Sequence, residues 1–243
     1  CVKLLAAAAR PNSALPILKA GEWSNWANLE RWRNIVTAGS ALAAVMHGAG
    51  GASFYRHNYL DINKNADWVK DVFKLIAHLD RLGLRQSVEP RNVAVLHSRA
   101  SEDFWQLRAN MSDDVDPLNA GIRRYATQKA VEELLLRKSI PNTFFYLEKE
   151  DELETELAKY PVIILPFPYS VSDRAVQAIE KAMEAGSQVI ICDRLGETNE
   201  LGTPRKKPIF NDWKRDGKAI FVDDVIGTFW RPKTSKTFLQ TVQ

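Results

Sequence analysis

Short apolar runs alternate with helix-like stretches between residues 91 and 193. Four runs are apolar at consecutive positions, and they cover residues 93–97, 143–147, 162–167 and 188–193. Strands of this kind are typical of a parallel sheet that is covered on both faces. The stretches 125–138, 150–159 and 172–185 carry apolar residues at three- and four-residue spacing. This alternation predicts parallel strands joined by crossover helices, with a last strand at 218–222.

Two longer stretches of this region show no clear period. Residues 100–121 contain Trp105, Arg108, Asp113, Asp114 and Asp116, and we expect a long irregular loop there. A loop of this length inside an α/β domain usually serves binding or assembly. Residues 194–213 are polar and contain glycine and proline, which predicts a second irregular segment.

The N-terminal part of the chain repeats the strand–helix rhythm on a smaller scale. Residues 14–23 and 52–57 are the expected strands, and residues 29–47 and 67–82 are the expected helices. Two parallel strands cannot cover their own edges, so we expect this part to need strands from outside the sequence or from a partner. Residues 86–91 are the expected linker, which divides the chain into domains at 1–88 and 89–243.

Composition and charge exclude few classes of protein. The chain is 45% hydrophobic and 26% charged, with a formal net charge of +3, as in ordinary globular proteins. The densest basic cluster, Arg205-Lys206-Lys207, is expected to be a solvated loop, with phosphate binding as the alternative. No apolar run approaches the length of a membrane helix. We expect neither a nucleic-acid nor a membrane partner, and the compartment stays open.

The motifs of several common chemistries are absent from the sequence. It contains no glycine-rich dinucleotide fingerprint and no P-loop, and its four histidines are scattered. We therefore expect no cofactor and no metal. Cys1 and Cys192 give neither a disulfide framework nor a metal spacing. Cys192 lies within an expected strand and is expected to pack as a small apolar residue. The alternative is a hydrolase that uses Cys192 as its nucleophile.

A carboxylate and two tryptophans follow the first strand of the N-terminal part. Glu22, Trp23 and Trp26 stand at the end of this strand. In a barrel of parallel strands the carboxyl ends of the strands form the active-site face. A carboxylate beside aromatic side chains that stack on sugar rings is typical of a glycosidase site. The alternative is that Glu22 is a solvated turn residue and that the tryptophans serve packing.

The second strand of this part also ends in aromatic and polar residues. Tyr55 and His57 belong to its end, and Asp61 follows in the next loop. Glycoside hydrolysis usually requires two carboxyl groups that flank the scissile bond. Asp61 is a nearby carboxylate, but its position does not clearly mark the end of a strand.

Three phrases of the N-terminal part resemble the family 42 β-galactosidases. They are Glu22 with Asn25-Trp26, the helix end Met46-His47-Gly48-Ala49, and the strand Ser53-Phe54-Tyr55-Arg56. The resemblance implies the last part of a (β/α)8 barrel. It further implies a flavodoxin-like, doubly wound domain similar to class I glutamine amidotransferases, which has lost their catalysis and mediates trimerisation.

The resemblance also implies roles for individual residues. Glu22 would be the nucleophile if residues 14–23 are the seventh barrel strand, as in related barrel glycosidases. In the family itself the nucleophile follows the aromatic strand by several residues, where Asp61 is the near carboxylate. Trp23, Trp26, Tyr55, His57 and Asp61 would contact the carbohydrate. The segment that carries the acid/base glutamate of the family is missing from this sequence.

Two functions follow from these observations. The first is part of a β-galactosidase-like glycoside hydrolase that acts on a carbohydrate through two carboxylates and forms a homo-oligomer, a trimer by resemblance. The second is a non-catalytic oligomerisation or carbohydrate-binding protein with a degenerate barrel. An Asn-Glu pair at the end of an upstream strand would favour the enzyme.

Overall fold

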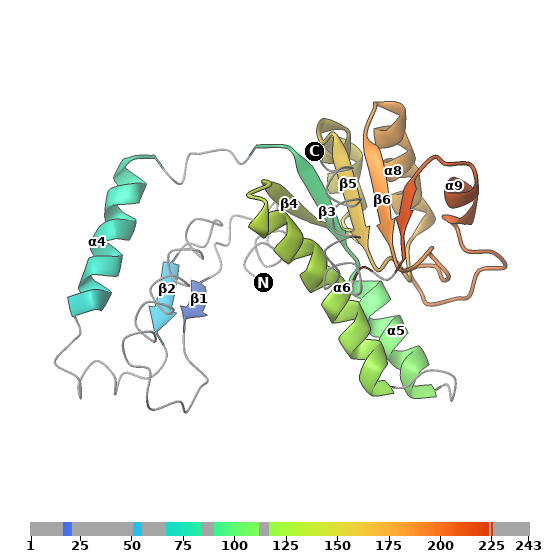
Figure 1. Cartoon of the computed structure of the whole chain (residues 1–243), viewed down its shortest axis with the longest axis horizontal. Coiled ribbons are helices and arrows are strands. Elements are labelled where there is room, and N and C mark those ends of the chain that lie inside the picture. Colours follow the sequence, from blue (N-terminus) through green and yellow to red (C-terminus); the bar gives the residue numbers. More distant parts are fainter. Residues whose placement is uncertain are drawn as a thin grey trace. The chain divides into compact units, whose positions relative to one another are not determined.

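The computed structural model describes residues 17–20, 51–54, 67–83, 90–111, 117–223 and 225. Side chains are described for residues 70–83, 90–111, 125–223 and 225. The chain divides into two compact units, Cys1–Val88 and Glu89–Gln243. Figure 1 shows both units, and each is described separately below.

The first unit contains a parallel pair of strands and a helix among its described residues. Strands β1 (Ile17–Ala20) and β2 (Gly51–Phe54) pair in register from Ile17 opposite Gly51 to Ala20 opposite Phe54. Helix α4 (Asp67–Arg81) follows β2. The two expected strands and the last expected helix of this part are therefore present. The expected helix at 29–47 lies outside the described residues.

The second unit is built on a five-stranded sheet in which every strand is parallel to its neighbours. The order across the sheet is β4-β3-β5-β6-β7, which is the flavodoxin-like arrangement of doubly wound folds. The strands have these bounds: β3 Val93–His97, β4 Asn142–Tyr146, β5 Val162–Pro166, β6 Gln188–Cys192 and β7 Ile220–Val222. The predicted α/β fold with a parallel sheet is confirmed.

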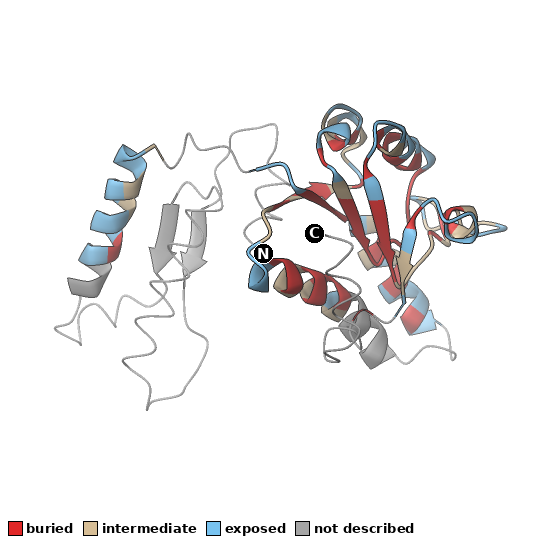
Figure 2. Cartoon of the chain, turned by 45° about the horizontal axis from the view of Figure 1, so that its top comes forward, coloured by how far each residue is buried: buried red, intermediate tan, exposed pale blue. Residues whose placement is uncertain are grey.

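Helices connect these strands and cover both faces of the sheet (Figure 2). Their bounds are α5 Arg99–Met111, α6 Pro117–Arg137, α7 Glu150–Glu156, the 3-10 helix η2 Leu157–Lys159, α8 Asp173–Glu184 and α9 Asn211–Arg215. The expected irregular loop at 100–121 is wrong, because α5 and the first turn of α6 occupy most of it. The expected irregular segment at 194–213 contains only the start of the short helix α9.

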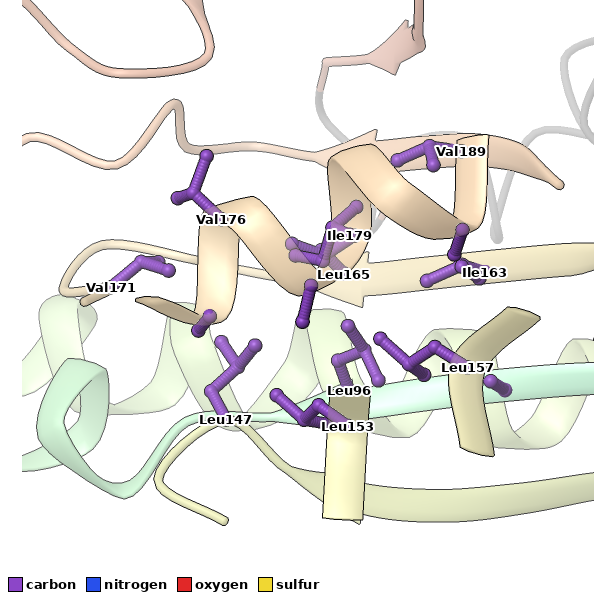
Figure 3. Close-up of a cluster of buried hydrophobic side chains, with 14 of the residues drawn as sticks. Leu96, Leu147, Leu153, Leu157, Ile163, Leu165, Val171, Val176, Ile179 and Val189 are labelled. Atoms are coloured by element: carbon purple, nitrogen blue, oxygen red, sulfur yellow. The ribbon is translucent and has the colours of Figure 1, made fainter. Parts of the chain in front are cut away.

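The main core lies between the sheet and the helices α7 and α8 (Figure 3). Alternate strand residues such as Leu96, Ile163 and Leu165 face this core, and each is at most 1% exposed. The intervening residues, including Val95 and Ile164, are also fully buried, and they lie on the opposite face of the sheet because successive strand residues point to opposite faces. Burial on both faces explains why these strands are apolar at consecutive positions.

Candidate functional site

The expected sugar-binding residues follow the two strands of the first unit. Because β1 and β2 are parallel and Ala20 pairs with Phe54, their carboxyl ends meet at one edge of the sheet. Glu22 and Tyr55 come one or two residues after these ends in the sequence. Glu22, Trp23, Trp26, Tyr55, His57 and Asp61 all lie outside the described residues. Their proposed roles therefore stay predictions.

In the second unit the usual ligand position is the crevice between the carboxyl ends of β3 and β5. These strands are neighbours in the sheet, and their connections leave towards opposite sides of it. Doubly wound folds bind their ligands at such a topological switch point. The side chains that stand there decide whether this unit can hold a ligand or carry out chemistry.

Two serine hydroxyls at the start of α5 bond the backbone of the segment after β5 across this crevice. The Ser98 hydroxyl accepts a hydrogen bond from the backbone N–H of Ser101 at 2.9 Å and so caps α5. It donates to the carbonyl of Ser170 at 2.9 Å. The Ser101 hydroxyl donates to the same carbonyl at 3.0 Å and accepts from the backbone N–H of Ser170 at 2.7 Å. All three serines are buried, and these hydroxyls bond the protein itself.

Aromatic side chains fill the rest of the crevice. Trp105 on α5 packs edge-on against Phe167 and Tyr169, with ring centroids 5.3 and 5.1 Å apart. Each of the three is at most 4% exposed. The guanidinium of Arg194 lies 4.0 Å from the centroid of the Trp105 ring, and Arg108 donates to the Tyr169 hydroxyl at 3.2 Å. These contacts leave this position closed to a ligand by packing.

Phe167 occupies the sharp turn that follows β5. Its φ of 57° lies in the left-handed region, which is unusual for an aromatic residue. A strained turn between strand and helix is where many hydrolases place a nucleophile. Here the residue is a phenylalanine, and its backbone N–H donates to the carbonyl of Cys192 at 3.1 Å instead of pointing at a substrate. The turn therefore shares the left-handed backbone of such a site, but it carries no nucleophile, and α8 begins only at Asp173.

Cys192 is not placed to act as the nucleophile of a hydrolase, the alternative considered above for this residue. It is the last residue of β6, is fully buried, and is flanked by Ile191 and by Asp193, whose φ is 63°. Burial strongly raises the pKa of its thiol, and the nearby Asp193 carboxylate adds to the effect. A thiol in such surroundings is inert. The prediction that Cys192 packs as a small apolar residue is therefore correct.

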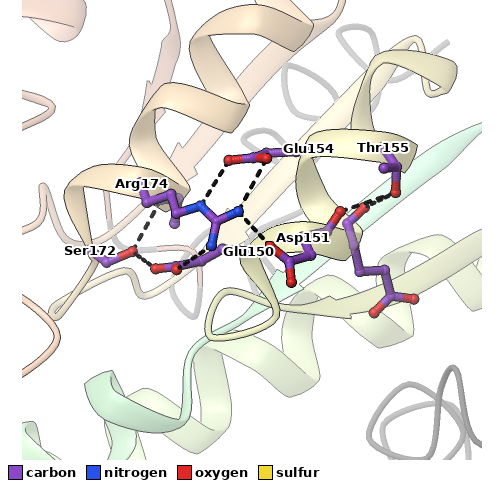
Figure 4. A network of polar contacts seen from close by, with 8 residues as sticks. Glu150, Asp151, Glu154, Thr155, Ser172 and Arg174 are labelled. Atoms are coloured by element: carbon purple, nitrogen blue, oxygen red, sulfur yellow. Dashed lines mark hydrogen bonds and ion pairs between the residues drawn. The ribbon is translucent and has the colours of Figure 1, made fainter.

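A shallow polar cavity of about 350 Å³ lies beside the first turn of α8. Its lining includes Glu150, Ser172, Arg174, Asn199 and Arg205. Figure 4 shows that Arg174 bridges to α7, donating to Glu154 at 2.9 Å and to Asp151. Ser172 caps α8 and accepts from the backbone N–H of Ala175 at 3.1 Å. The pairs of Arg174 with Asp151 and Glu154 neutralise part of the charge beside this cavity.

Within the described ranges, no group of three or more side chains could hold a metal ion. His97 packs edge-on against Tyr146, with ring centroids 5.0 Å apart, and its Nε2 lies 3.8 Å from Glu102. Among the helices that the structure describes, none has the length and hydropathy to span a bilayer.

The sequence reading missed the residues that close the crevice. The sequence predicts a loop at Trp105 and an irregular segment at Arg194, whereas in the structure the guanidinium of Arg194 stacks on the Trp105 ring. A usable signal was present before α5: Ser98 stands at the cap position and Glu102 lies in the first turn. Serine followed by an acidic residue in the first turn is typical of a helix start.

Several solved structures share this fold. A β-galactosidase from Rahnella sp. R3 matches with a TM-score of 0.53 and 21% identity, over 72% of this chain and 27% of its own. A catalytic mutant of a GH42 β-galactosidase from G. stearothermophilus matches with a TM-score of 0.52 and 15% identity, over 70% and 25%. The β-galactosidase from Bacillus circulans sp. alkalophilus matches with a TM-score of 0.51 and 19% identity, over 71% of this chain and 26% of its own.

These likenesses concern the fold, because the identities are low. The chain spans about a quarter of the length of the structures that it matches. No protein-family model and no curated protein matches the sequence. The partial barrel followed by a flavodoxin-like domain, expected from three short phrases, agrees with these structures.

Proposed function

We propose that this chain is part of a β-galactosidase-like glycoside hydrolase. The observation that carries the proposal is the order of its elements. A parallel strand pair and a helix precede a parallel sheet of flavodoxin-like order, and three β-galactosidase structures share this fold at TM-scores above 0.5. The motifs at Glu22 and Tyr55 support the same function independently, because they come from the sequence.

The proposed chemistry takes place at the carboxyl ends of the barrel strands. Glu22 attacks the anomeric carbon of a β-galactoside and forms a glycosyl-enzyme intermediate. A glutamate from an earlier barrel strand, outside this sequence, protonates the leaving oxygen and then activates the water that releases the sugar. Trp23, Trp26 and Tyr55 line the sugar subsites, and His57 and Asp61 hydrogen-bond the sugar hydroxyls.

The second unit serves assembly in this proposal. Its switch-point crevice is filled by Trp105, Phe167 and Tyr169, and the turn after β5 carries no nucleophile. These observations support a role in protein contacts instead of catalysis. A homo-oligomer, a trimer by resemblance, is the proposed assembly, and its size in solution is measured by light scattering.

The test uses the protein with its complete barrel and an aryl β-galactoside. We expect Glu22→Gln to lower kcat by roughly a thousandfold or more, because the nucleophile is lost while the shape is kept. Glu30→Gln is the matched control, since Glu30 stands eight residues later at the start of an expected helix, and it should keep kcat within about twofold. Azide should restore turnover to Glu22→Ala, because a small anion can replace the missing carboxylate.

Asp61→Asn separates the two candidates for the nucleophile. A large loss in Asp61→Asn with normal turnover in Glu22→Gln would transfer the role to Asp61. An active wild-type protein that tolerates both changes would remove both residues from the mechanism. A complete protein that is inactive on aryl glycosides would contradict the proposed function itself.

A further inference from the structure

The net positive charge of the chain is concentrated in one short stretch of the second unit. Residues 205–218 contain six of its 33 basic residues and two of its 30 acidic residues, a formal charge of +4. The rest of the chain keeps 27 basic and 28 acidic residues, a formal charge of −1. This stretch therefore accounts for the entire positive balance of the protein.

The core holds this stretch in a fixed position. Phe210 and Trp213 are 0% and 6% exposed, and their rings pack together with centroids 4.9 Å apart. Helix α9 leaves Lys214 and Arg215 exposed to solvent. The exposed cations of the stretch form what is here called the basic corner, made of Lys206, Lys207, Lys214, Arg215 and Lys218.

Acidic residues neutralise only part of the basic corner. Lys207 and Arg215 both contact Asp212, at 2.5 and 2.8 Å, and Lys218 adds to the positive field around it. Arg215 also pairs with Asp216 at 2.8 Å. Together these cations hold the pKa of Asp212 below its usual range. Five cations against these two carboxylates leave a local excess of three positive charges.

Two further contacts keep the cations in place. Lys214 lies over the ring of Phe221, with its Nζ 3.8 Å from the ring centroid. Arg205, at the start of the stretch, pairs with Asp173 of α8 at 2.6 Å and is more buried than the corner itself. The corner is thus an exposed, positively charged stretch anchored by the buried Phe210 and Trp213, and it attracts polyanions over about a Debye length.

We propose that the basic corner binds an anionic polysaccharide through its sulfate or carboxylate groups. The choice of a polysaccharide rests on the proposed function, because a glycoside hydrolase meets charged glycans. Single-stranded nucleic acid is bound largely by stacking of its bases on exposed aromatic rings, and Phe210 and Trp213 are buried. Duplex nucleic acid needs no such rings and is therefore an outcome of the test. Insertion into a membrane would need an apolar exposed helix face, whereas α9 buries Trp213 in the core.

The test measures binding of the whole protein to immobilised dextran sulfate, with neutral dextran as the reference. The test variant is Lys206→Gln/Lys218→Gln, which leaves the Lys207–Asp212 and Arg215–Asp212 pairs intact. The matched control is Lys138→Gln/Lys181→Gln, two exposed lysines of other elements with the same loss of charge. The thermal midpoint of each variant checks that it is folded.

We expect the wild type to bind dextran sulfate at low salt and to be released at about 0.5 M salt. The test variant should bind at least about fivefold more weakly, and the control should stay within about twofold. Absence of binding, or an equal loss in both variants, would overturn the inference. Stronger binding of duplex DNA or of phosphatidylserine vesicles would replace the polysaccharide as the partner. Galactoside hydrolysis is measured separately, so that the binding result can be interpreted even if the protein does not hydrolyse galactosides.

Discussion

Replacing Phe167 by glycine and by alanine separates two opposing contributions at the turn after β5. Both changes remove a ring that is 1% exposed and packs against Trp105, which costs about 3–5 kcal/mol in a core. Alanine keeps the cost of the left-handed backbone, about 1–2 kcal/mol, because φ is 57°. Glycine removes that cost and adds about 0.5–1 kcal/mol of backbone entropy.

The balance predicts an unusual order of stability. We expect Phe167→Gly to be more stable than Phe167→Ala by about 0.5–1 kcal/mol, although both are less stable than the wild type. The matched site is Phe145, which is also 1% exposed but lies in strand β4. There the order should reverse, since glycine weakens a strand relative to alanine by about 0.5–1 kcal/mol.

Urea unfolding of the four variants, followed by circular dichroism, measures these differences as free energies of unfolding. A Phe167→Ala variant at least as stable as Phe167→Gly would refute the reasoning. It would mean that the turn relaxes out of the left-handed region once the ring is gone.

Two further outcomes follow from buried ionisable groups. Cys192 should resist iodoacetamide in the folded protein and react only in denaturant, because burial raises the pKa of its thiol; rapid labelling in native buffer would contradict its place in the core. Burial also raises the pKa of the Glu197 carboxyl, so the folded state binds its proton more tightly than the unfolded state does. Ionisation of Glu197 therefore destabilises the fold as the pH rises above the usual pKa of a glutamate. Glu197→Gln should therefore raise the urea midpoint more at pH 7 than at pH 4, and a larger gain at pH 4 would show that pairing with Arg194 outweighs burial.

The strands of the second unit could be predicted because burial on both faces leaves few polar positions. Val93–His97 was predicted to the residue, and β4, β5 and β6 to within one residue at each end. Helix α5 was missed for the opposite reason. Its buried stripe is Ser101, Trp105 and Ala109, and a serine and an alanine give almost no hydrophobic signal.

The closing of the crevice could not be predicted from the sequence at all. The left-handed backbone of Phe167 contradicts the preference of aromatic residues, so only tertiary packing explains it. The contact between Arg194 and Trp105 joins residues 89 positions apart, and a cation in a polar stretch is normally solvated. The assignment of Glu22 depends on the resemblance, and it awaits the kinetic test described above.

The strand order of the second unit has a consequence for how the protein is made. β5, β6 and β7 join the sheet on one side of β3 in the order in which the ribosome releases them. Each new strand therefore finds its neighbour already present, and no strand has to wait for a later one. The open edge moves outward along the growing chain, which shortens the time during which a nascent strand can pair with another molecule.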